Sequence, residues 1–91
     1  MIYLDYSATT PVNKEVLSSF SKAAIEYPGN PNSLHKLGLE SNKLIEASTK
    51  QIAKILVVKE NEIIYTSGSS ESNILAIKGI ADKYKNRGKH I

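Results

Sequence analysis

Residues 63–73 of this 91-residue chain read Ile63-Ile64-Tyr65-Thr66-Ser67-Gly68-Ser69-Ser70-Glu71-Ser72-Asn73. The first four residues are apolar, aromatic or β-branched, which predicts a short buried strand. The turn after them leads into apolar residues at helical spacing, which predicts a helix over about 70–86. Because a strand, a turn and a helix in this order form most of a βαβ unit, we expect an α/β fold.

The turn itself is a candidate anion site. The first N–H groups of a helix have no partner within the helix and lie at its positive end, which suits a phosphate. Gly68 permits a tight turn, and the hydroxyls around it add donors. Plain helix capping, with Glu71 complementing the dipole, explains the same residues. The turn is neither a Walker A loop nor a dinucleotide fingerprint, because it has a single glycine.

Two more helices are expected before this turn. Apolar residues recur every three to four positions over about 13–27, where Thr10 or Asn13 can cap the helix. The Pro- and Gly-containing turn 28–32 ends it, and Ser33 is expected to cap a second helix over about 34–56. Gly38 near the start of that helix indicates close packing or a bend.

The last residues begin another element. Gly88 lies where a left-handed cap of the third helix is expected, and Lys89-His90-Ile91 is typical of the start of a second strand. A lone strand leaves its backbone groups unpaired, so partner strands must come from elsewhere. We therefore interpret the chain as a piece of a larger protein that is mostly helical in isolation, with one or two short strands.

Composition excludes several classes of function. The chain has no cysteine, which excludes disulfides, thiolate metal sites and a thiol nucleophile within it. No apolar run approaches the roughly 20 residues of a membrane span and no secretory leader is evident, so we expect a cytoplasmic protein without a membrane segment. The net charge is +3, with a basic excess over residues 78–91. We attribute that excess to the negative end of a helix dipole rather than to nucleic acid.

Three motifs occur in a recognisable order and spacing: Tyr3-Leu4-Asp5-Tyr6-Ser7-Ala8-Thr9-Thr10-Pro11, Gly29-Asn30-Pro31-Asn32-Ser33-Leu34-His35 and Thr66-Ser67-Gly68-Ser69-Ser70-Glu71-Ser72-Asn73. Together they resemble the amino-terminal part of the cysteine desulfurases, pyridoxal-phosphate enzymes of the class V aminotransferase group. The resemblance covers essentially the whole chain. It is greatest to the branch that makes sulfur for iron–sulfur clusters.

The resemblance implies roles for particular residues. Those that would bind the phosphate of pyridoxal 5'-phosphate are Gly68, Ser69 and Ser70. Ser70 stands where the family usually has threonine, and it keeps the hydroxyl. Those expected near the substrate site are Ala8, Thr9, Thr10 and Asn30. The family's Schiff-base lysine and catalytic cysteine match no position here, so no catalytic residue is expected in these 91 residues, no metal site is implied, and the chain alone should be inactive.

The resemblance also implies the nature of the parent protein. It would be a homodimeric α/β enzyme of aminotransferase type (fold type I), with residues 1–28 in its small domain and 29–91 beginning its cofactor-binding large domain. It would convert L-cysteine to L-alanine and pass persulfide sulfur to iron–sulfur scaffold or thiolation partners. Two alternatives stay open: another class V enzyme (a selenocysteine lyase or an aminotransferase), or a stand-alone helical binding module with a basic carboxyl end. We expect the exposed apolar faces of the isolated 91-residue chain to promote its self-association.

Overall fold

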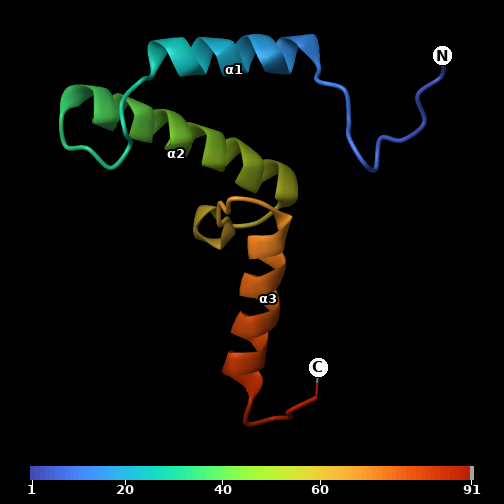
Figure 1. Ribbon diagram of the computed structural model, residues 1–91. Helices are drawn as coiled ribbons and strands as arrows, with labels where there is room; N and C mark the ends of the chain where they lie inside the picture. The colour runs from blue at the N-terminus through green and yellow to red at the C-terminus, as the bar shows by residue number, and fades with distance from the viewer. Residues whose placement is uncertain (91) are drawn as a thin grey trace. The chain divides into compact units, whose positions relative to one another are not determined.

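The computed structural model describes residues 1–90, and its regular elements are helical (Figure 1). They are α1 (Lys14–Glu26), α2 (Lys36–Leu56), the short 3-10 helix η1 (Glu60–Glu62) and α3 (Ser69–Tyr84). The three α-helices expected from apolar periodicity are confirmed, with ends that differ by one or two residues. The chain divides into two compact units, Met1–Ile52 and Ala53–Ile91.

The first unit opens with a loop that is organised around one carbonyl group. The Asp5 carbonyl oxygen accepts from the N–H groups of Ala8 and Thr9, at 3.1 and 3.2 Å. The Tyr3 hydroxyl lies 2.9 Å from the same oxygen and 2.7 Å from the Thr9 carbonyl oxygen. The Tyr3 and Tyr6 rings are 5.6 Å apart between centroids. The loop therefore has its own hydrogen-bonded structure although its side chains are exposed.

Helix α1 is capped by Asn13, one of the two residues predicted for that role. Its side-chain oxygen accepts from the N–H groups of Glu15 and Val16, at 2.8 and 3.3 Å. The other candidate, Thr10, instead donates its hydroxyl to the Tyr6 carbonyl at 3.2 Å. An Asn at this position satisfies N–H groups that have no partner inside the helix.

The turn after α1 packs directly on the start of α2. A side chain at Gly29 would place its Cβ 2.3 Å from the Leu37 carbonyl carbon, and one at Gly38 would place it 2.3 Å from the Ser33 carbonyl oxygen. The close packing predicted at Gly38 is thus confirmed. The buried Ser41 hydroxyl adds a bond to the Tyr27 carbonyl at 3.3 Å. Contacts between backbone atoms, rather than side-chain packing, therefore join the turn after α1 to the start of α2. This junction is the corner between α1 and α2.

The predicted cap of α2 is wrong. The helix begins at Lys36, so His35 rather than Ser33 precedes it, and the His35 Nδ1 atom accepts from the Gly38 N–H at 3.3 Å. The reason is the preceding turn: the Ser33 N–H already donates to the Asn30 carbonyl at 2.9 Å. That bond makes Ser33 part of the turn and delays the helix by two residues.

The second unit begins with the end of α2. The Val58 N–H donates to the Ala53 carbonyl at 3.0 Å, and Val57 has a left-handed φ of 56°. This bond and this backbone conformation form the usual glycine-type helix ending, here with valine at the left-handed position. Ala53 is the only buried apolar residue among residues 1–90.

The strand expected over Ile63–Thr66 is not confirmed. Ile63 is extended, with φ −97° and ψ 124°, but no residue within 1–90 belongs to a strand. A strand exists only when its backbone groups pair with a neighbour, and the described chain supplies none. The second expected strand begins at Lys89 and His90, which are also unpaired, and Ile91 lies outside the described residues.

The left-handed cap predicted at Gly88 is wrong, because none of the described glycines has a positive φ. Helix α3 ends at Tyr84, followed by Lys85 in a right-handed conformation. The Arg87 N–H donates to the Tyr84 carbonyl at 2.7 Å, so the chain leaves the helix through a tighter turn. Such a turn keeps φ negative and needs no glycine.

Most apolar side chains of the helices are exposed. Phe20 on α1 is 70% exposed and Ile80 on α3 is 62% exposed. Within residues 1–90, no buried residue belongs to α1 or α3. No helix in this range has the length and apolar character needed to cross a lipid bilayer. The apolar faces are therefore uncovered within the described chain.

Candidate functional site

The turn into α3 leaves a group of donors without acceptors. The first hydrogen bond of the helix joins the Ser72 N–H to the Gly68 carbonyl at 3.1 Å. Within residues 1–90, nothing accepts from the N–H groups or from the hydroxyls of Ser69 and Ser70. Both residues are exposed. Four donors therefore gather at the positive end of a helix, which is the arrangement that binds anions.

Glu71 braces the side of the turn that precedes the helix. Its carboxylate accepts from the N–H of Ser67 at 2.8 Å and from the Ser67 hydroxyl at 2.6 Å. These bonds, the hydroxyl first and the N–H second, hold the pKa of Glu71 below its ordinary value. The N-cap residue of α3 is Gly68, so Glu71 binds the residue before the cap, and the contact is not the capping box, which uses the N–H of the N-cap itself. Glu71 was expected only to complement the helix dipole, and the structure adds two hydrogen bonds to Ser67.

A second brace holds the Gly68 carbonyl. The hydroxyl oxygens of Thr66 and Ser72 lie 2.6 Å apart, and they lie 3.1 and 3.2 Å from the Gly68 carbonyl oxygen. Each hydroxyl has one proton, so one of them donates to the carbonyl and the other donates to its neighbour. Hydrogen bonds thereby connect Thr66, before the turn, and Ser72, after it, to the Gly68 carbonyl.

The structure thus divides the hydroxyls into two groups. Those of Thr66, Ser67 and Ser72 bind within the turn, and those of Ser69 and Ser70 do not. Capping and anion binding are therefore compatible, because they use different residues. The sequence pattern did not indicate the bracing role of Thr66 and Ser72; a glutamate four residues after Ser67 was the available signal for the other brace.

The backbone conformation of Gly68 is not one that only glycine adopts. Its φ of 168° and ψ of −179° describe an extended backbone that other residues adopt, and a Cβ there would meet no atom within 4 Å. Gly68 was expected to permit a tight turn, and in the described chain its backbone conformation is one that does not depend on glycine. Its lack of a side chain leaves open space beside the free donors.

The other predicted site residues lie in the first unit. Ala8, Thr9 and Thr10 share the opening loop, where the Thr9 hydroxyl donates to the Ala8 carbonyl at 2.8 Å. Asn30 lies in the turn between α1 and α2, and its side-chain oxygen accepts from the Asn32 N–H at 2.9 Å. Within residues 1–90, no hydrogen bond joins Asn30 to the opening loop. The structure brings the first three together and gives Asn30 a role in its own turn.

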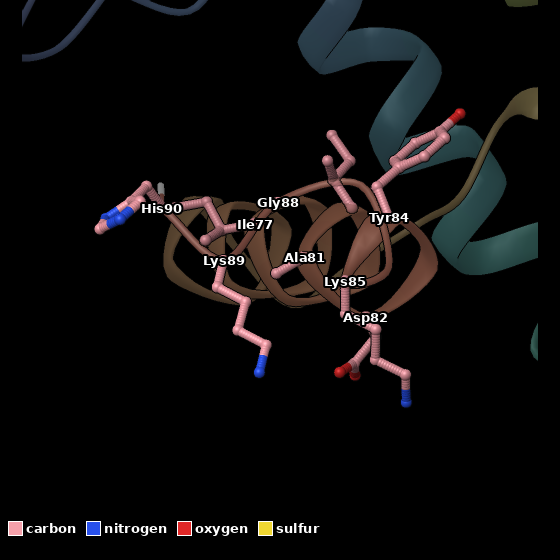
Figure 2. A pocket seen from close by; sticks show the side chains of 9 residues that line it. Ile77, Ala81, Asp82, Tyr84, Lys85, Gly88, Lys89 and His90 are labelled. Atoms are coloured by element: carbon pink, nitrogen blue, oxygen red, sulfur yellow. The ribbon is translucent and has the colours of Figure 1, made fainter.

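A hollow of about 600 Å³ lies at the opposite end of α3 from the turn (Figure 2). Apolar side chains of α3 and the basic residues after it line this hollow, and it contains none of the predicted site residues.

Lys83 is the basic residue in the last turn of α3, as dipole complementation predicts. The Lys83 Nζ and Arg87 Cζ atoms lie 5.4 and 5.1 Å from the centre of the Tyr84 ring. Two of the basic residues within 78–91 therefore make cation–π contacts with Tyr84.

Comparison with known proteins identifies a family. The family model described as aminotransferase class-V matches residues 2–91. Cysteine desulfurase IscS of Dictyoglomus turgidum is 48% identical over 90 residues, which cover 99% of this chain and 23% of that protein. The NifS/IcsS protein homolog of Lactobacillus delbrueckii is 50% identical over 91 residues, covering 100% of this chain and 24% of that protein.

A human relative extends the range of organisms. The cysteine desulfurase of Homo sapiens is 43% identical over 91 residues, covering 99% of this chain and 20% of that protein. The chain thus spans about a quarter or less of the length of these curated relatives. No solved structure matches it.

Proposed function

The chain belongs to the class-V aminotransferase family, and from this membership we propose that it is the amino-terminal part of a cysteine desulfurase. The parent enzyme converts L-cysteine to L-alanine and retains the sulfur as an enzyme persulfide for iron–sulfur or thiolation partners. The names of relatives that are 43–50% identical over almost the whole chain support this proposal. The 91 residues contain no cysteine, so the proposal takes the sulfur-accepting thiol to lie elsewhere in the parent.

The observation that carries the proposal is the set of free donors at the start of α3. We assign the phosphate of pyridoxal 5'-phosphate to the turn formed by Gly68, Ser69 and Ser70. A phosphate carries acceptor oxygens only, and this turn presents N–H and hydroxyl donors without acceptors. The donors therefore fit the group. When bound, the cofactor supplies an electron sink for chemistry at the amino acid.

The chain's own residues bind and orient. The N–H groups of Ser69 and Ser70 would donate to the phosphate oxygens, and the helix dipole would favour the negative charge. The hydroxyls of the same two serines add donors that can turn toward the anion. The missing side chain at Gly68 keeps the space beside them open. These residues anchor the cofactor, while bond breaking at the substrate belongs to the rest of the parent.

The remaining assignments follow from the same family resemblance. We propose that Ala8, Thr9, Thr10 and Asn30 lie near the substrate, that residues 1–28 belong to the small domain, and that 29–91 begin the cofactor-binding domain. The internal hydrogen bonds of the Ala8–Thr10 loop support a defined position for it. The parent is proposed to be a cytoplasmic homodimer.

The activity is tested on the full-length parent. Purified enzyme loaded with cofactor should form L-alanine from L-cysteine, with one sulfur mobilised for each alanine. L-selenocysteine and an amino donor paired with a 2-oxo acid serve as parallel substrates. Turnover restricted to selenocysteine, or amino transfer to the 2-oxo acid, would assign the parent to one of the other class V activities instead.

The phosphate assignment is tested by Ser70→Ala in the full-length apo-enzyme. Loss of a hydroxyl that donates to a charged phosphate should weaken pyridoxal 5'-phosphate binding about tenfold. Binding of pyridoxal, which lacks the phosphate, should be unchanged. Ser70→Thr restores the hydroxyl and should bind normally, and Ser48→Ala on α2 is the matched control. Equal affinities of wild type and Ser70→Ala for the phosphorylated cofactor would place the phosphate elsewhere.

A further inference from the structure

Glu71 is a carboxylate in the first turn of the helix that bears the free donors. It is the third residue of α3, after Ser69 and Ser70. A negative side chain in that turn is attracted to the same positive end that would receive a phosphate. Here the carboxylate instead accepts two bonds from Ser67, which precedes the helix, at 2.6 and 2.8 Å. The free N–H groups are therefore left for another anion.

These two bonds fix the backbone around the donors. Ser67 and Glu71 stand on opposite sides of Gly68, Ser69 and Ser70, so their contact closes the turn into a loop of five residues. The Thr66–Ser72 pair reinforces the closure through the Gly68 carbonyl. All of these contacts are made between residues 66–72 of the chain itself. A site held in its binding geometry before the ligand arrives does not have to be ordered on binding.

We propose that Glu71 is a positioning residue that preforms the phosphate turn in the cofactor-free enzyme. The inference rests on the proposed function, because it takes the phosphate to bind at Ser69 and Ser70. Glu71 itself contacts neither the phosphate nor the substrate in this proposal. It acts by holding the Ser67 N–H and hydroxyl, and so by fixing the direction of the next donors along the chain.

Two physical effects of Glu71 oppose each other, and a pair of variants separates them. The hydrogen bonds to Ser67 order the turn, whereas the negative charge repels a phosphate. Glu71→Gln keeps an oxygen that accepts from the Ser67 N–H and removes the charge. Glu71→Ala removes both. If ordering dominates, the glutamine variant retains most of the cofactor affinity and the alanine variant does not.

The experiment measures binding to the full-length apo-enzyme by titration with pyridoxal 5'-phosphate and, in parallel, with pyridoxal. We expect Glu71→Ala to weaken binding of the phosphorylated cofactor about tenfold and to leave pyridoxal binding unchanged. Glu71→Gln should stay within about threefold of wild type. Ser67→Ala, which removes one of the two bonds and is the milder change for folding, should lose about threefold.

The outcomes distinguish this inference from the proposed function. Normal cofactor binding by Glu71→Ala alongside weak binding by Ser70→Ala would overturn the positioning role and leave the phosphate site in place. Normal binding by both variants would overturn the phosphate site itself. An equal loss of affinity for pyridoxal and for its phosphate in Glu71→Ala would also overturn the positioning role. If Glu71→Ala does not fold, the cofactor affinities of Ser67→Ala and Glu71→Gln decide whether Glu71 has the positioning role.

Discussion

At the scale of single residues, the exposed turn before α3 depends on the ionised form of one side chain. Protonation removes the charge from the Glu71 carboxylate, to which Ser67 donates its N–H and hydroxyl. The bonds to Ser67 favour the ionised form, so the folded turn lowers the pKa of Glu71 below 4.5. A lowered carboxyl pKa means that the stabilising contribution is complete above the unfolded value and is lost as the pH falls through the folded value.

We therefore expect the carboxyl of Glu71 to titrate below pH 4.5 in the folded chain, as followed by NMR of the side-chain carbon. Ser67→Ala removes the hydroxyl, which is the larger of the two causes, and should move the midpoint up toward 4.5. Ser72→Ala leaves the bonds to Glu71 intact and is the control. A midpoint that is unchanged in Ser67→Ala would contradict the bond to the hydroxyl.

At the scale of elements, the corner between α1 and α2 depends on two glycines whose backbones touch their neighbours. Neither glycine is needed for a positive φ. Each is needed because a Cβ would lie within 2.3 Å of backbone atoms, and backbone cannot move aside as a flexible side chain can. By contrast, a Cβ at Gly79 in α3 would meet no atom within 4 Å.

The matched pair Gly38→Ala and Gly79→Ala tests this contrast in the full-length protein. Gly38→Ala forces overlap at the corner and should lower the free energy of unfolding by about 2–3 kcal/mol. Gly79→Ala improves helix propensity and should raise it by up to about 1 kcal/mol, provided that the parent leaves the space open. Urea unfolding followed by circular dichroism measures both. Similar effects of the two variants would refute the close contact at Gly38.

Helix periodicity was sufficient to predict the elements, but not their ends. Apolar residues every three to four positions located all three α-helices, because that spacing matches the period of the α-helix. The ends depend on which backbone groups are already bonded. Ser33 is used by the preceding turn and Gly88 follows a tight helix exit, so neither caps a helix. The strand at Ile63 needs a partner that no local pattern reveals.

The sequence likewise predicted the location of the candidate site but not the roles of its individual hydroxyls. A single glycine, several hydroxyls and the start of a helix indicated anion binding at residues 68–70. Which hydroxyls brace the turn and which stay free was not predictable, because it depends on side-chain directions over distances of about one hydrogen bond. Thr66 and Ser72 became recognisable as a brace only when the 2.6 Å between their oxygens was known.

At the scale of the whole molecule, helices in both units of the chain expose apolar side chains within residues 1–90. Val16 and Phe20 on α1 are 62% and 70% exposed, and Ile74 and Ile80 on α3 are 59% and 62% exposed. Burying each such side chain contributes roughly 1.5–3 kcal/mol, and here that contribution is absent. Faces of this kind drive association with other apolar surfaces.

The isolated 91-residue chain is therefore expected to self-associate. Sedimentation should give a mass above 10.0 kDa that rises with concentration, and a dye that binds exposed apolar surface should fluoresce. The full-length parent, which covers these faces in the proposed fold, is the control and should not bind the dye. A concentration-independent mass of 10.0 kDa without dye binding would show that the faces are satisfied within the chain.

The uncovered faces of α1 and α3 have a consequence for protein synthesis. In the proposed parent these residues leave the ribosome before the strands that would pair with Ile63, at about 5–20 residues per second. Helical hydrogen bonds are local to each segment, whereas the extended run at Ile63 waits for strands that have not yet been translated. The nascent chain of the proposed parent would therefore expose these apolar side chains until the rest of the fold is translated, and ribosome-associated chaperones would be suited to cover them.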